Sequence, residues 1–128
     1  MIVVDSSGWL EFLTDGVLAD VYAAHLRQPK QVLTPTIVVY EVYKHAKRLL
    51  SEEDAVDAVA AMQKTQLIPL SNELALTAAD LSLAHKLPMA DAIVLATAQA
   101  HNAEVVTSDS DFENVPGVTY IPKKSTAQ

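Results

Sequence analysis

The chain has 128 residues, half of them hydrophobic, and a formal net charge of −7, so it can bury one hydrophobic core but is too short to divide comfortably into two domains. The absence of cysteine excludes a disulfide framework and a thiolate zinc site, and it favours a reducing compartment. No apolar run approaches the ~20 residues of a membrane span and no signal peptide is recognisable, so we expect a cytoplasmic protein.

Short apolar runs alternate with longer stretches of helical periodicity along the chain. The first run, residues 1–4, predicts a buried strand that stops at Asp5, and helices are predicted from there to residue 26. Further strands are predicted at 31–34, 67–70, 105–107 and 118–121. Further helices are predicted at 36–50, 52–64, 72–85 and 89–101. Ser51 and Asn72 are the expected N-caps of two of these helices, and Pro69 favours an edge position for the third strand.

This alternation predicts the fold class. Strands that are separated by helices are joined by parallel crossovers, so we expect a three-layer α/β/α sandwich around a short, mostly parallel central sheet. Residues 1–122 are expected to form a single domain, and residues 123–128 a polar C-terminal tail.

Two aspartates directly follow predicted strands. Asp5 comes after the first apolar run, and Asp109 comes just after the strand at 105–107. In parallel sheets the functional crevice lies beyond the carboxyl ends of the strands. If the two strands are neighbours, these carboxylates approach within ~4–6 Å and repel each other by several kcal/mol at an intermediate dielectric. A bound cation would offset that repulsion.

Two further acids lie in segments that are otherwise apolar. Glu41 lies within IVVYEVY at 37–43 and Asp91 within MADAIVLA at 89–96, and neither segment contains Lys or Arg. An ionised side chain in such surroundings is costly to desolvate unless it is paired or ligated. Taken singly, Asp5 and Asp91 could be simple N-caps and Asp109 an Asx-turn residue. Taken together, the four acids predict one carboxylate site.

Carboxylate oxygens without cysteine or organised histidine select Mg²⁺ or Mn²⁺ over zinc. These ions bind phosphate oxygens, so the expected chemistry is phosphoryl transfer or phosphodiester hydrolysis. The acidity of the chain argues against binding nucleic acid mainly through clustered cations. However, Lys44, Lys47 and Arg48 follow Glu41 on one predicted helix and could guide an RNA backbone toward the acids. The alternative for these three is a solvated helix end whose cations suit the helix dipole.

Four segments together resemble the PIN-domain ribonucleases, specifically the VapC-type toxins of bacterial and archaeal toxin–antitoxin pairs. They are IVVDSS at 2–7, VYEV at 39–42, PMADAIVLATA at 88–98 and VTSDSDF at 106–112. The resemblance covers the whole chain, and four such segments in order are far more specific than any one alone.

This resemblance implies roles for individual residues. The four catalytic acids of the family match Asp5, Glu41, Asp91 and Asp109, and Asp111 matches a further aspartate that supports the metal site. The implied ligands of Mg²⁺ or Mn²⁺ are Asp5, Asp91, Asp109 and Asp111.

The resemblance further implies that Ser6 and Thr107 hydrogen-bond the acids or their waters. It implies an endoribonuclease that cleaves an RNA substrate, forms a homodimer and is inhibited by a small cognate antitoxin.

Other classes fit less well. A haloacid-dehalogenase-like phosphatase needs a second aspartate where Ser7 stands and a strand-associated lysine, and a receiver domain needs paired early acids. The alternative from a different class is a catalytically silent PIN-like module that binds only a partner protein.

Overall fold

The structure, a computed structural model, describes residues 1–123. Within this range, five strands form one sheet in the order β3-β2-β1-β4-β5, and every neighbouring pair is parallel. The strands are β1 (Ile2–Val4), β2 (Val32–Pro35), β3 (Gln66–Ile68), β4 (Glu104–Thr107) and β5 (Val118–Tyr120). The predicted α/β sandwich is therefore confirmed, and its sheet is parallel throughout.

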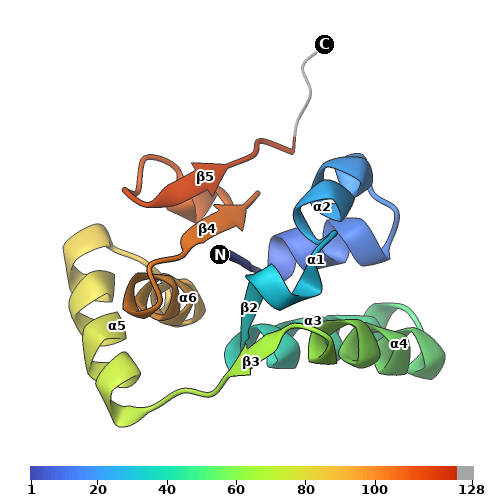
Figure 1. The fold of residues 1–128 in the computed structure, drawn as a ribbon, viewed down its shortest axis with the longest axis horizontal. Helices are drawn as coiled ribbons and strands as arrows, with labels where there is room; N and C mark the ends of the chain where they lie inside the picture. Colours follow the sequence, from blue (N-terminus) through green and yellow to red (C-terminus); the bar gives the residue numbers. More distant parts are fainter. Residues whose placement is uncertain (124–128) are drawn as a thin grey trace.

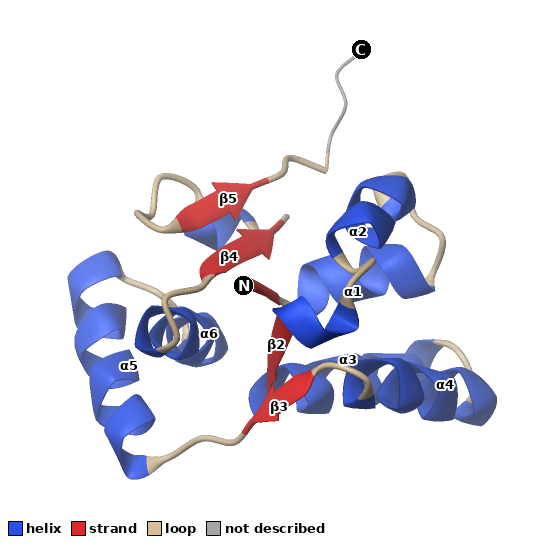
Figure 2. Cartoon of the chain, viewed as in Figure 1, coloured by secondary structure: helices blue, strands red, loops and turns tan. Residues whose placement is uncertain are grey.

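Helices cover the sheet on both sides (Figures 1 and 2). They are α1 (Ser6–Leu13), α2 (Ala19–His25), α3 (Thr36–Leu49), α4 (Glu52–Gln63), α5 (Asn72–His85) and α6 (Met89–Ala100), with short 3-10 helices η1 (Pro29–Gln31) and η2 (Ser110–Phe112). The α1–α2 pair lies on one side and the α5–α6 pair on the other, while α3 and α4 lie together near β2 and β3.

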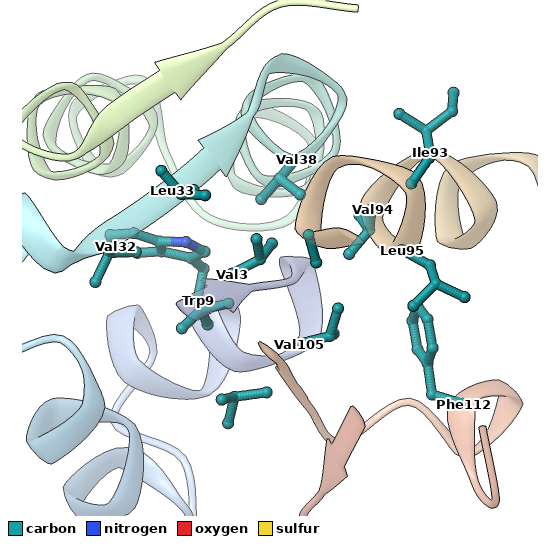
Figure 3. Packing of buried hydrophobic residues seen from close by; sticks show 14 of the residues in the cluster. Val3, Trp9, Val32, Leu33, Val38, Ile93, Val94, Leu95, Val105 and Phe112 are labelled. Carbon is teal, nitrogen blue, oxygen red and sulfur yellow. The ribbon is translucent and has the colours of Figure 1, made fainter. Parts of the chain in front are cut away.

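The centre of the sheet is β1, which pairs with β2 on one side and β4 on the other. Val3 lies opposite Leu33 of β2 and Val105 of β4, and all three side chains are buried. A strand that is covered by helices on both faces is apolar at successive positions, which is why the first run could be recognised as a strand. Figure 3 shows these valines and Leu33 together with Trp9 of α1 and Leu95 of α6 in one hydrophobic core.

Of the two N-cap residues predicted from the sequence, one is confirmed and one is wrong. Ser51 caps α4 by accepting a hydrogen bond from the backbone N of Asp54 at 3.0 Å, as predicted. The predicted cap of α5 is wrong by one residue, because Ser71 has the extended backbone and accepts from Leu74 N at 3.1 Å, while Asn72 is already helical. Both residue types are good N-caps, so the sequence alone does not separate them.

The edge position predicted for the third strand is confirmed, although the strand itself ends before Pro69. Within residues 1–123, no helix is both long enough and apolar enough to cross a membrane. Apart from Lys123, the tail predicted at 123–128 lies outside the described residues.

Candidate metal centre

Five acidic side chains, which we call the acid cluster, gather near the carboxyl ends of β1 and β4. Asp5 directly follows β1, and Asp109 follows β4 after one serine. The strand order reverses between β1 and β4, because the chain builds β2 and β3 on one side of β1 and then returns to add β4 and β5 on the other. Ligands of open parallel sheets bind at such reversal points. The other members are Glu41 in α3, Asp91 in the first turn of α6 and Asp111 in η2.

Three members of the acid cluster approach one another closely enough to share a cation. Asp91, Asp109 and Asp111 each offer one carboxylate oxygen, and these oxygens lie within 4.8 Å of one another. Asp109 also accepts a hydrogen bond from the backbone N of Asp111 at 2.9 Å, so its turn role and a ligand role coexist. The carboxylates converge because η2 turns the chain directly after β4.

Asp5 differs from these three acids in its burial and in its hydrogen bonds. It is only 3 % exposed, and Oδ1 accepts hydrogen bonds from Ser7 Oγ at 2.6 Å and from Gly8 N at 3.3 Å. Oδ2 accepts from Thr107 Oγ1 at 2.6 Å. Since a carboxylate oxygen has two lone pairs, Oδ1 is fully used and Oδ2 keeps one free. Asp5 is thus the N-cap of α1 and can still offer one lone pair to a cation.

The carboxylate of Asp91 lacks the hydrogen-bond donors that surround Asp5. Among residues 1–123, no hydrogen-bond partner reaches its buried Oδ2, and the N-cap of α6 is Pro88, so the capping alternative for Asp91 is wrong. Burial, followed by the charge of Asp109 and a hydrogen bond with it, raises the pKa of Asp91 to about 8. An orphaned carboxylate oxygen beside two other carboxylates is suited to a divalent cation, which would favour its ionised form.

Glu41 lies at the side of this arrangement. Burial raises the pKa of its carboxyl group, a hydrogen bond from Ser6 lowers it, and the charges of Asp5 and Asp109 raise it further. The Ser6 side chain therefore faces Glu41, and the supporting role predicted for Ser6 stays a prediction.

Ser7 was missed by sequence analysis, although it binds Asp5 as tightly as the predicted Thr107 does. Its Oγ also accepts a hydrogen bond from the backbone N of Ser108 at 3.0 Å. The available signal was a hydroxyl two residues after an aspartate, which is a common local hydrogen-bonding pattern.

Lys44, Lys47 and Arg48 lie on an exposed side of α3, and they differ in whether an acidic side chain neutralises their charge. Lys47 forms an ion pair with Glu52 of α4. Within residues 1–123, Lys44 and Arg48 form no ion pair, and the Lys44 ammonium lies 5.4 Å from the ring centre of the exposed Tyr40. Lys44 and Arg48 are therefore the better candidates for contacting an anionic ligand.

Known proteins share both the sequence pattern and the fold of this chain. The sequence profile of the PIN domain family matches residues 2–118. The chain belongs to the PIN domain family. No curated protein matches this PIN domain significantly.

Solved structures share its fold. A toxin–antitoxin complex from Klebsiella pneumoniae contains a chain that is 28% identical, with a TM-score of 0.80 over 93% of this chain and 96% of that one. VapC20 of Mycobacterium tuberculosis, a toxin that cleaves the sarcin–ricin loop, is 20% identical, with a TM-score of 0.79 over 95% of this chain and 100% of that one. VapBC2 of Rickettsia felis, bound to promoter DNA, is 16% identical, with a TM-score of 0.75 over 94% and 98% of the two chains. The fold of this PIN domain is thus that of VapC toxin–antitoxin proteins.

Proposed function

We propose that this protein is a Mg²⁺- or Mn²⁺-dependent endoribonuclease that acts in the cytoplasm as the toxin of a toxin–antitoxin pair. The observation that carries the proposal is the buried Oδ2 of Asp91, which has no hydrogen-bond partner among residues 1–123 and lies beside Asp109 and Asp111. Membership of the PIN domain family and the similarity to a chain of the Klebsiella complex support it.

The residues that would hold the metal are Asp91, Asp109 and Asp111, together with the free lone pair of Asp5 Oδ2. A bound Mg²⁺ or Mn²⁺ supplies an activated water and stabilises the charge that develops on the phosphate. All donors are hard oxygen atoms, which is the donor set these ions prefer.

The chain's own residues orient the reaction and move the proton. Glu41 is half-buried and its pKa is raised, so its carboxylate is suited to accept a proton from the attacking water. The water oxygen bonds to phosphorus, the bond to the 3′ oxygen breaks, and that oxygen leaves as a hydroxyl after taking up a proton from solvent. Ser7 and Thr107 keep Asp5 fixed throughout, because both hydroxyls donate to it.

The RNA would approach along α3. Lys44 and Arg48 supply free positive charge there, Lys47 contributes less because Glu52 neutralises it, and the Tyr40 ring, which is 57% exposed, offers a stacking surface for an unpaired base. Bound metal would offset the net charge of −7 where the scissile phosphate lies.

We also propose that a small cognate antitoxin inhibits the enzyme and that the protein forms a homodimer. The first proposal is supported by the Klebsiella structure of similar fold, which is a toxin–antitoxin complex.

The test is incubation of the purified protein, free of antitoxin, with total RNA in Mg²⁺, Mn²⁺ or EDTA. We expect discrete cleavage that requires metal, and we expect Asp5→Asn and Asp91→Asn to lower kcat by about 10³-fold or more, because such groups act as one unit. Asp57→Asn, at an exposed position of α4, removes the same charge and should cleave normally.

A catalytically silent interaction module is the second candidate. It predicts no cleavage in any metal and equal behaviour of all three variants, and that result would overturn the proposed function.

A further inference from the structure

The buried side chain of Tyr22 has no part in the proposed chemistry, yet its hydroxyl reaches the edge of the acid cluster. Tyr22 belongs to α2 and is 0% exposed, and its hydroxyl lies 2.7 Å from Ser108 Oγ. Burial raises the pKa of Tyr22 to about 12, so the phenol keeps its proton throughout the neutral range. The ring occupies this position because residue 8 is glycine: a Cβ there would lie 2.4 Å from Cε1 of Tyr22.

Ser108 is connected to Asp5 and is followed directly by Asp109. Its backbone N donates to Ser7 Oγ at 3.0 Å, and Ser7 donates to Asp5. The backbone N of Asp109 donates to Thr107 Oγ1 at 2.9 Å, and Thr107 also donates to Asp5. The turn from Thr107 to Asp109 is therefore attached to Asp5 through two hydroxyls, and Tyr22 attaches the same turn to α2.

The hydrogens of this network can be assigned by elimination. Ionised Asp5 only accepts hydrogen bonds, so the single hydroxyl hydrogens of Ser7 and Thr107 both point at it. The 3.3 Å approach between these two hydroxyls consequently uses neither hydrogen. Both oxygens instead accept backbone N–H groups of the turn. The Ser108 side chain does not bind Asp5; it bonds to the Tyr22 hydroxyl, which also lies within hydrogen-bonding reach of Ser7.

Packing alone does not explain the Tyr22 hydroxyl. The ring fills the space beside Gly8 whether or not it carries an oxygen, and burying a hydroxyl costs free energy unless it is hydrogen-bonded. A phenylalanine would fill the same space without that cost. The oxygen matters because its partner lies in the turn that carries Asp109 and leads to Asp111.

We propose that the Tyr22 hydroxyl is a positioning group for the metal centre: by holding Ser108, it fixes the turn that brings Asp109 and Asp111 to Asp91. This inference rests on the proposed function, since it concerns how the same site is kept in shape. In this proposal Tyr22 acts through Ser108 and is not itself a ligand of the metal.

The test uses the full chain and the variants Tyr22→Phe, Ser108→Ala and the double variant. Free Mn²⁺ is followed by electron paramagnetic resonance to obtain the Mn²⁺ affinity, and kcat and KM for RNA are measured separately. Removing groups that orient metal ligands typically costs 10- to 100-fold in metal affinity or activity. We expect Tyr22→Phe to weaken Mn²⁺ binding and lower kcat by about tenfold while KM is unchanged. The double variant should be no worse than either single one, because both remove the same contact.

A matched control is Thr34→Val. It also removes one buried hydroxyl contact, the 2.6 Å bond between Thr34 and Thr65, but at a position outside the acid cluster. It should lower thermal stability without changing Mn²⁺ affinity or kcat. If Tyr22→Phe behaves like this control, the hydroxyl only stabilises the fold and the inference is overturned. If the wild type binds Mn²⁺ but cleaves no RNA, the proposed function fails, and the Mn²⁺ affinities of the variants still decide this inference.

Discussion

Two carboxylates of the acid cluster, Asp5 and Asp91, lie in opposite kinds of surroundings. Asp5 is almost completely buried, and three donors from the protein bind its oxygens. Asp91 is only half-buried, yet its Oδ2 has no partner within residues 1–123. Burial raises the pKa of both groups, but at Asp5 hydrogen bonds oppose the shift, whereas at Asp91 the neighbouring acids add to it.

In the proposed function, this difference would prepare the acid cluster for a metal ion before the ion binds. One carboxylate is fixed in place by the scaffold, so it needs no ion to be oriented. The other is kept unsatisfied and therefore gains most when an ion binds. Three measurements on the purified chain test this contrast between Asp5 and Asp91.

The largest effect is expected from metal linkage. Mn²⁺ at about 100 times its dissociation constant should raise the free energy of unfolding by about 2.7 kcal/mol, because it binds only the folded state. Asp91→Asn should remove most of this gain, as measured by urea unfolding with and without Mn²⁺. Asp57→Asn, on the surface of α4, should keep it in full. An equal gain in wild type and Asp91→Asn would show that the ion binds elsewhere.

The next effect concerns the same amide substitution at the two acids in EDTA. Asp5→Asn should lower the free energy of unfolding by about 1–3 kcal/mol, because an amide nitrogen would replace an oxygen that accepts from a hydroxyl. Asp91→Asn should raise it by about 1 kcal/mol, because at pH 7 the wild-type chain must take up a proton on Asp91 in order to fold, whereas an amide needs none. Urea unfolding at pH 7 measures both. Changes of the same sign would contradict the contrast between the two acids.

The smallest effect is a pH dependence of the metal-free protein. The folded-state pKa of Asp91, about 8, lies above its ordinary value of 3.8, so the folded state binds this proton more tightly than the unfolded state. Stability is then highest below pH 4 for this group and falls as the pH rises to about 8. Because Asp91 is partly exposed, solvent screening limits the loss to about 1 kcal/mol. Thermal unfolding in EDTA from pH 5 to pH 8 should show this decline, and Asp91→Asn should flatten it. A rising stability in this range would be inconsistent with the raised pKa.

The sequence was sufficient to predict the fold class and to place Asp5 and Asp109 near each other. Apolar runs that stop at an aspartate locate the ends of buried strands, and parallel strands bring those ends to the same edge. Asp91 and Glu41 could be recognised because a charge within an apolar helix needs a partner.

The sequence could not predict which hydroxyl binds which acid. Ser6 and Ser7 are adjacent, but they point to different carboxylates because successive helical residues lie about 100° apart around the axis. The contact between Tyr22 and Ser108 joins residues that are 86 positions apart, and no local pattern encodes it. The pairing of Lys47 with Glu52 likewise depends on how α4 folds back against α3.

The place of β1 at the centre of the sheet also has a consequence for biosynthesis. β1 leaves the ribosome before its partner β4, which is made about a hundred residues later, since Val4 pairs with Val106. Synthesis proceeds from the N-terminus at roughly 5–20 residues per second. Until β4 and η2 have emerged, Asp5, Glu41 and Asp91 lack the two acids that complete the cluster. Under the proposed function, this order of assembly would keep the growing chain inactive until its synthesis is nearly complete.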